Sequence, residues 1–110
     1  MSNVPKITDD QFDTEILQSE IVAVVDFGAT WCGPCKKLHP IMAELAEEMA
    51  GQVKIVEVDV GDNPDTAAKY AVVSVPQVLI FKNGEVAERI VGVLPKPKLK
   101  DKIEAHLLKG

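Results

Sequence analysis

Two hydrophobic patterns alternate along the 110 residues of this chain. Short runs rich in valine and isoleucine have the nearly continuous apolar character of buried strands. The segments between them carry apolar residues every three or four positions and turn charged residues outward, as amphipathic helices do. Strands that alternate with helices are typical of βαβ units, which build a parallel sheet. We therefore predict an α/β fold with strands at residues 4–7, 21–27, 53–60, 77–82 and 85–91.

Capping and turn residues delimit the predicted helices. Thr8 can cap a first helix, and Gln11 three residues later completes a capping box. A second helix follows residue 32, and a third starts at Asn63-Pro64, a dipeptide suited to an N-cap and the first helical position. The last helix follows Pro97, while Asn83-Gly84 predicts a tight hairpin between the final two strands. The expected order is therefore βαβαβαββα.

Length, composition and charge narrow the class of protein. A chain of 110 residues with 46% hydrophobic composition fits one domain over residues 1–110, with a core that needs no cross-links. The net charge of −5 argues against nucleic acid and against an anionic membrane surface as partners. Neither a signal-peptide pattern nor a membrane-spanning run of about 18 apolar residues is present. We expect a cytoplasmic monomer whose partners are proteins.

The two cysteines, Cys32 and Cys35, are the strongest chemical signal in the sequence. A disulfide that closes so short a loop stabilises a fold by at best about 2 kcal/mol, so a structural bridge is a poor explanation for the pair. In a reducing compartment, close cysteine pairs are usually catalytic or metal-binding. Cys32 follows a predicted strand and opens a predicted helix, whose free N–H groups and dipole favour a thiolate. Cys35 lies one turn later, within disulfide reach.

The spacer between the cysteines indicates whether the pair reduces or oxidises its substrates. Gly33 and Pro34 carry no charge, and without a cation to stabilise the thiolate the pair is expected to be reducing. We predict that Cys32 attacks a substrate disulfide and that Cys35 then attacks Cys32, which releases the reduced product. The cycle uses no bound cofactor. Electrons must come back from elsewhere, because the sequence has neither a dinucleotide fingerprint nor a P-loop.

A set of motifs spread over the chain extends this interpretation. They are Asp26-Phe27, Trp31-Cys32-Gly33-Pro34-Cys35-Lys36, Asp62-Asn63-Pro64, Lys69-Tyr70, Val75-Pro76, Phe81-Lys82-Asn83-Gly84 and Gly92. Together they resemble the thioredoxin family over essentially the whole length. The resemblance implies a thioredoxin fold, with a central five-stranded mixed sheet flanked by four helices, and general reduction of protein disulfides. It also implies re-reduction by a thioredoxin reductase, which draws electrons from NADPH or ferredoxin.

The resemblance assigns roles outside the cysteine pair. Asp26 interrupts an apolar strand, where burial is expected to raise its pKa, and the family implies that it is an acid/base for the Cys35 proton. The alternative is a strand end that reaches water. The family also implies a cis bond before Pro76 that faces the cysteines and leaves the Val75 backbone free to pair with an extended substrate. The expected substrate surface is completed by Trp31, Gly33, Pro34, Gly92 and Val93.

Three positions depart from the family pattern. Glu57 stands where many bacterial thioredoxins carry a lysine, and two carboxylates beside each other resist joint ionisation. We hypothesise that His39, or a nearby lysine, compensates for the missing cation beside Asp26. The alternative is that Glu57 points to solvent and His39 is an ordinary surface histidine. Gly28, in place of a tryptophan, changes the local packing, and Gln77 in place of a threonine is a milder departure.

Three other functions remain open at this point. A structural zinc site would use the cysteines as one half-site, but only His39 and His106 could complete it and they form no second knuckle, so we expect no metal. A disulfide oxidase or isomerase is disfavoured by the uncharged spacer and by the missing export signal. A non-redox binding subunit or chaperone that uses the same surface stays possible as an added role.

Overall fold

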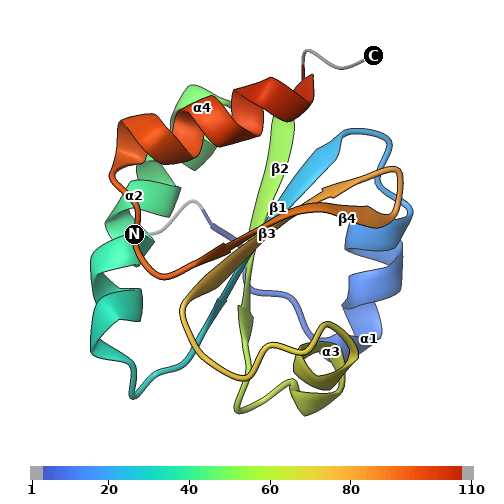
Figure 1. Ribbon diagram of the computed structural model, residues 1–110. Helices are drawn as coiled ribbons and strands as arrows, with labels where there is room; N and C mark the ends of the chain where they lie inside the picture. The colour runs from blue at the N-terminus through green and yellow to red at the C-terminus, as the bar shows by residue number, and fades with distance from the viewer. Residues whose placement is uncertain (1–3, 108–110) are drawn as a thin grey trace.

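The computed structural model describes residues 4–107, which form a mixed four-stranded sheet between two layers of helices (Figure 1). The strand order is β2-β1-β3-β4, with β1 parallel to β2 and antiparallel to β3, and with β3 antiparallel to β4. The elements in chain order are α1 (Asp9–Phe12), the π-helical turn η1 (Asp13–Leu17), β1 (Val22–Gly28), α2 (Gly33–Glu48), β2 (Val53–Asp59), α3 (Pro64–Lys69), β3 (Gln77–Lys82), β4 (Glu85–Val91) and α4 (Lys96–Leu107).

The first predicted strand is wrong, and the sheet has four strands rather than the expected five. The N-terminal segment forms only an isolated parallel bridge between Lys6 and Glu57. In this bridge Ile7 N–H donates to the Glu57 carbonyl and Glu57 N–H donates to the Pro5 carbonyl, both at 2.9 Å. The next donor, toward the Ile55 carbonyl, would be the Pro5 nitrogen, which carries no hydrogen. Proline therefore stops the ladder after one bridge.

The predicted capping box and hairpin are confirmed. Thr8 N–H donates to Gln11 Oε1 at 3.0 Å at the start of α1. Asn83 and Gly84 both adopt left-handed φ angles, 55° and 80°, as the tight turn between β3 and β4 requires. The last helix begins at Lys96, before Pro97 rather than after it, because proline is tolerated in the first turn of a helix.

Alternate residues of β1, β2 and β3 face the two helical layers. Helices α2 and α4 cover one face, and α1, η1 and α3 cover the other (Figure 1). The first layer packs aliphatic side chains around Val24, Leu38, Met42, Leu99 and Ile103. The second packs the aromatic rings of Phe12, Phe27, Tyr70 and Phe81, with neighbouring ring centroids 5.2–6.5 Å apart.

The end of the sheet near α2 positions the polar residues of interest. On β1, the face that buries Val22 and Val24 against α2 continues to Asp26 and Gly28. The chain then runs directly from Gly28 to the cysteine pair at the start of α2. Among residues 4–107, no helix is long and apolar enough to cross a membrane.

Candidate active site

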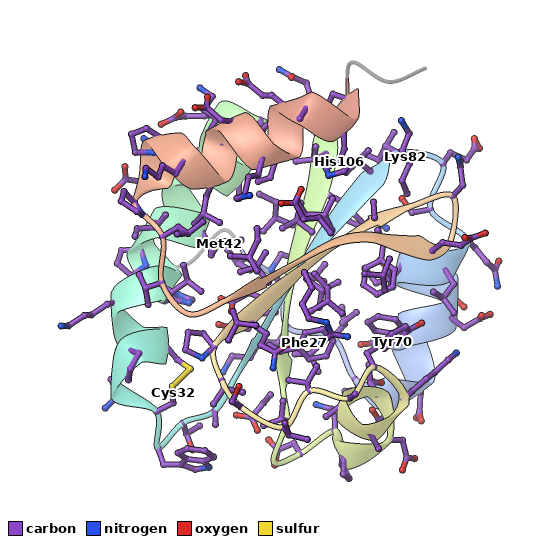
Figure 2. The ribbon with its side chains drawn as sticks, viewed as in Figure 1. Phe27, Cys32, Met42, Tyr70, Lys82 and His106 are labelled. Atoms are coloured by element: carbon purple, nitrogen blue, oxygen red, sulfur yellow. A yellow bond between two sulfur atoms is a disulfide. The ribbon has the colours of Figure 1, made fainter. Side chains whose placement is uncertain are left out.

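Cys32 and Cys35 form a disulfide at the N-terminal end of α2, with their Cα atoms 5.3 Å apart (Figure 2). Cys32 is the N-cap of this 16-residue helix, and its sulfur accepts a hydrogen bond from the Cys35 N–H at 3.2 Å. The N–H groups of the first helical turn have no partner within the helix, so they are available to stabilise negative charge. The predicted position of the cysteines at a helix start is confirmed.

The surroundings of the disulfide differ on its two sides. Cys32 is only 4% exposed, whereas Cys35 is half-buried. Trp31 beside the pair is 75% exposed, and both spacer residues, Gly33 and Pro34, are also exposed. These three residues therefore present a surface next to the sulfur atoms. Their part in substrate binding stays a prediction.

The segment before β3 lies at the same end of the sheet as the disulfide. The start of β3 pairs with the end of β1, from which the chain leads to the cysteines. The bond between Val75 and Pro76 is cis, as predicted. Gly92 N–H donates to the Pro76 carbonyl at 3.0 Å, which joins two segments expected to bind substrate, and Val93 beyond it is exposed. Their substrate contacts stay a prediction.

Gln77 has a structural role that the sequence did not reveal. Its side chain is buried, donates to the Ser74 carbonyl at 2.9 Å and accepts from Arg89 at 2.7 Å. Arg89 also donates to the Tyr70 carbonyl at 2.6 Å. These bonds fix the loop that leads into the cis peptide. The Arg89 contact spans two strands, and no local signal in the sequence points to it.

Asp26 is buried, only 3% exposed, so the alternative of a strand end that reaches water is wrong. Its Oδ1 has no hydrogen-bond partner among the described residues. Burial, and then the negative charge of Glu57 alongside, raise the pKa of Asp26 to about 7. A carboxyl group with such a pKa can take up or release a proton near neutral pH.

Glu57 lies directly beside Asp26, because the two residues are paired in the register of β1 and β2. Glu57 Oε1 is also buried and lacks a partner among the described residues, while Oε2 contacts Nδ1 of His39 at 3.0 Å. The Glu57 side chain is 17% exposed, so the alternative that it points to solvent is wrong. The pairing of His39 with this carboxylate agrees with the hypothesis of a compensating partner.

A cavity of about 470 Å³ lies behind the disulfide. It opens beside Gly28, where an added Cβ would lie 3.4 Å from the Cys35 sulfur. A side chain at this position would therefore contact Cys35, which agrees with the expectation that Gly28 changes the local packing. Sequence reasoning missed the cavity, since its walls come from segments far apart in the chain. They include Lys6, Asp26, Cys35, Lys36, His39 and Glu57.

The two histidines of the zinc hypothesis are not brought together. His106 contacts Glu88 at 2.7 Å and lies at the opposite end of the molecule from Cys32 (Figure 2). Within residues 4–107, no group of three or more histidine, cysteine, aspartate or glutamate side chains is arranged to hold a metal ion.

Known proteins match the chain over nearly its full length. The family model Thioredoxin matches residues 3–105. A thioredoxin of Staphylococcus epidermidis is 45% identical over 104 residues, which cover 94% of this chain and 98% of the relative. Thioredoxin 1 of a Nostoc species is 39% identical over 107 residues, 97% of this chain and 100% of the relative. With its cysteine pair at the start of α2, the chain belongs to the thioredoxin family and is a thiol-disulfide oxidoreductase with protein-disulfide reductase activity.

Proposed function

We propose that Cys32 is the attacking nucleophile and Cys35 the resolving thiol. The observation that carries this assignment is the hydrogen bond from the Cys35 N–H to the Cys32 sulfur at the N-cap of α2. Helix N-termini favour thiolates, and the thiolate is the reactive form of cysteine. The sulfur that accepts this hydrogen bond is that of Cys32, so the start of the helix favours the thiolate at Cys32.

The proposed cycle moves two electrons from the dithiol to the substrate. The Cys32 thiolate attacks one sulfur of a substrate disulfide, and the other substrate sulfur leaves as a thiolate and takes a proton. The Cys35 thiol gives its proton to Asp26 and attacks the Cys32 sulfur. This attack breaks the mixed disulfide, forms the Cys32–Cys35 bond and releases the second substrate thiolate. The raised pKa of Asp26 supports its role as the base.

The substrate surface is proposed to lie around Trp31 and the cis peptide. An extended substrate would pair with the backbone at Val75, in the strand-addition mode of recognition. Exposure of the tryptophan and the link between Gly92 and Pro76 support this placement. The full set of proposed contacts is Trp31, Gly33, Pro34, Val75, Pro76, Gly92 and Val93.

Re-reduction is proposed to require a thioredoxin reductase supplied with electrons by NADPH or ferredoxin. The chain itself would hold no cofactor, because dithiol exchange needs none. The uncharged spacer supports a reducing pair, and a catalytic dithiol fits a reducing compartment such as the cytoplasm. Family membership supports a reductase and protein disulfides as the partners.

Trapping of the mixed disulfide tests the assignment of the two thiols. We expect Cys35→Ser to accumulate a covalent complex with a peptide that contains one disulfide, because the attacking thiol remains and the resolving thiol is gone. The matched variant Cys32→Ser should form none. Mass spectrometry after acid quenching measures both. Accumulation with Cys32→Ser instead would reverse the roles.

A further inference from the structure

Three titratable side chains lead from the interior to the surface behind the disulfide. We call Asp26, Glu57 and His39 the carboxylate cluster; they come from β1, β2 and α2. Asp26 is 3% exposed, the Glu57 side chain 17% and the His39 side chain 36%. Exposure therefore increases from Asp26 through Glu57 to His39.

Contacts within the carboxylate cluster link the three residues in the same order, from Asp26 to Glu57 to His39. Asp26 and Glu57 are register partners on parallel strands, and each has one buried oxygen without a hydrogen-bond partner among the described residues. The other Glu57 oxygen contacts His39 Nδ1 at 3.0 Å. Burial of a polar atom without a hydrogen-bond partner is energetically costly, and here two such atoms lie on residues that are paired across neighbouring strands. A proton or a water molecule between the two side chains would satisfy these oxygens.

Other charged groups around the cluster leave this arrangement undisturbed. Lys6 on the N-terminal segment and Lys36 on α2 line the same cavity, as does Asp59 on β2. Asp59 Oδ1 accepts hydrogen bonds from two backbone N–H groups, at 2.8 and 3.1 Å, in the turn that follows β2. Within residues 4–107, the carboxylate of Glu57 contacts His39 and forms an ion pair with neither lysine.

We propose that Glu57 and His39 carry to solvent the proton that Asp26 receives from Cys35. The proposal rests on the proposed function, in which Cys35 is the resolving thiol. After the Cys35 thiol has protonated Asp26, the proton passes to Glu57 and then to Nδ1 of a neutral His39 whose own proton is on Nε2. The imidazole releases the Nε2 proton to solvent, and Asp26 is again a carboxylate. When the disulfide is reduced again, the Cys35 thiolate takes up a proton along the same path in reverse, which restores the starting tautomer of His39. Glu57 and His39 act through Asp26 and touch neither sulfur, so they are positioning residues.

The competing route is direct exchange between Asp26 and water in the cavity. A cavity of about 470 Å³ that is lined in part by charged side chains is large enough to hold water. The two routes differ in what they need from His39. The relay needs a group that binds and releases a proton, whereas direct exchange needs only that the cavity keeps its shape.

The test follows the resolving step in variants of His39. Reduced protein is mixed with the peptide disulfide, quenched with acid, and analysed for mixed disulfide and oxidised product from about pH 5 to about pH 9. His39→Gln keeps a hydrogen-bond donor toward Glu57 but cannot carry a proton. The matched control is His106→Gln, because His106 contacts Glu88 at 2.7 Å in a similar pair far from the disulfide.

We expect His39→Gln to slow resolution about tenfold and to remove one inflection from its pH profile. Formation of the mixed disulfide by Cys32 should be unchanged. Free imidazole should restore resolution in His39→Ala, whereas Glu57→Gln should be slow with or without imidazole. His106→Gln should match the wild type at every pH.

Two results would overturn the relay. If His39→Gln behaves as His106→Gln does, the proton leaves through the cavity. If His39→Gln is slow but keeps the wild-type pH profile, and imidazole rescues nothing in His39→Ala, the histidine has only a structural role. Failure of the proposed function would look different, because mixed disulfide through Cys32 would then not form in the wild type either.

Discussion

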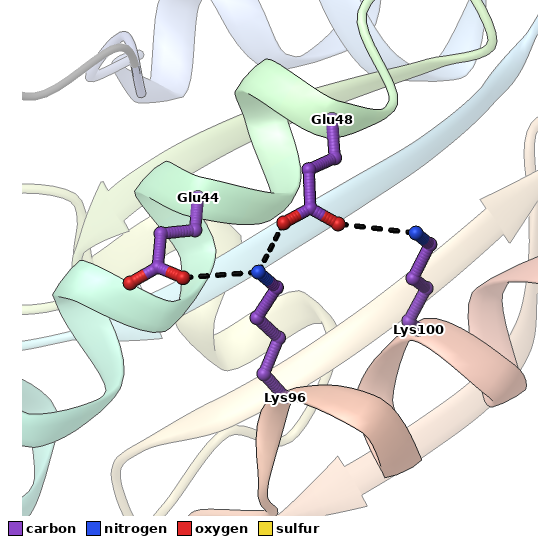
Figure 3. A network of polar contacts seen from close by, with 4 residues as sticks. All are labelled: Glu44, Glu48, Lys96 and Lys100. Carbon is purple, nitrogen blue, oxygen red and sulfur yellow. Dashed lines mark hydrogen bonds and ion pairs between the residues drawn. The ribbon is translucent and has the colours of Figure 1, made fainter.

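The two ends of α2 carry ionic clusters of opposite character. At its N-terminal end lies the carboxylate cluster, in which Asp26 is buried and two oxygens are unpaired among the described residues. At its C-terminal end, Glu44 and Glu48 reach Lys96 and Lys100 of α4 (Figure 3). Lys96 contacts both glutamates, and the Lys96–Glu44 and Lys100–Glu48 distances are both 3.0 Å. Each of these exposed charges has an opposite charge beside it.

The comparison separates charged groups that stabilise the fold from charged groups that are available for chemistry. Hydrogen bonds from Lys96 and then Lys100 lower the pKa of Glu48, so this carboxylate stays ionised when the protein folds. Such exposed ion pairs contribute little to the free energy of unfolding, and salt screens them. A buried carboxylate without a partner instead destabilises the fold when it is charged. Perturbed groups of this kind cluster at functional sites.

The largest expected effect is a pH-dependent loss of stability caused by Asp26. The folded protein holds this proton up to about pH 7, whereas the unfolded chain releases it near the ordinary aspartate value of 3.8. The unfolded state therefore binds fewer protons in this interval, and the free energy of unfolding falls as pH rises, by about 4 kcal/mol in all. Denaturant titration of the oxidised protein at several pH values measures this fall.

Asp26→Asn should abolish the fall in the free energy of unfolding with rising pH, whereas the control variant Glu48→Gln should retain it. A wild-type stability that rises steadily from about pH 4 to about pH 7 would contradict the assignment of the raised pKa to Asp26.

The next effect is kinetic and concerns the same residue. Asp26→Asn removes the base for the Cys35 proton, so the resolving step should slow by about 100-fold near neutral pH. Quenched-flow analysis of the mixed disulfide measures the rate. Because the same substitution removes a buried charge, the variant should be slower and yet more stable than the wild type above pH 7. An unchanged rate and pH profile would rule out Asp26 as the base.

The smallest effect is expected at the exposed cluster. Glu48→Gln removes the shared partner of Lys96 and Lys100, and the thermal midpoint should fall by less than about 3 °C. Disulfide reduction should stay at the wild-type rate, since the cluster lies at the far end of α2 from the cysteines. Calorimetry in low and high salt provides the check, and the difference from the wild type should shrink as salt is added. A large, salt-independent loss would mean that the two clusters do not differ in kind.

Much of this arrangement follows from local sequence, and the exceptions have physical causes. Periodicity located β1 and α2, and the Cys-x-x-Cys motif with its helix placed the disulfide, because both signals act within a few residues. The supposed first strand failed at Pro5, whose missing N–H limits pairing to one bridge with Glu57. The pattern of apolar residues carries no information about that missing hydrogen bond.

Long-range contacts were harder to anticipate. The pairing of His39 with Glu57 was open in the sequence, since either side chain could have turned to solvent, and it depends on how α2 packs beside β2. The contact between Arg89 and Gln77, and the cavity beside Gly28, depend on segments that meet only after folding. Tertiary packing, rather than propensity, determines each of them.

The position of Trp31 gives the molecule an optical reporter of its own chemistry. It is the chain's one tryptophan, it directly precedes Cys32 and its indole is largely exposed to solvent. Its emission therefore comes from a single site next to the bond that is made and broken. Oxidation, reduction and docking of a partner on this face can be followed in real time without any label.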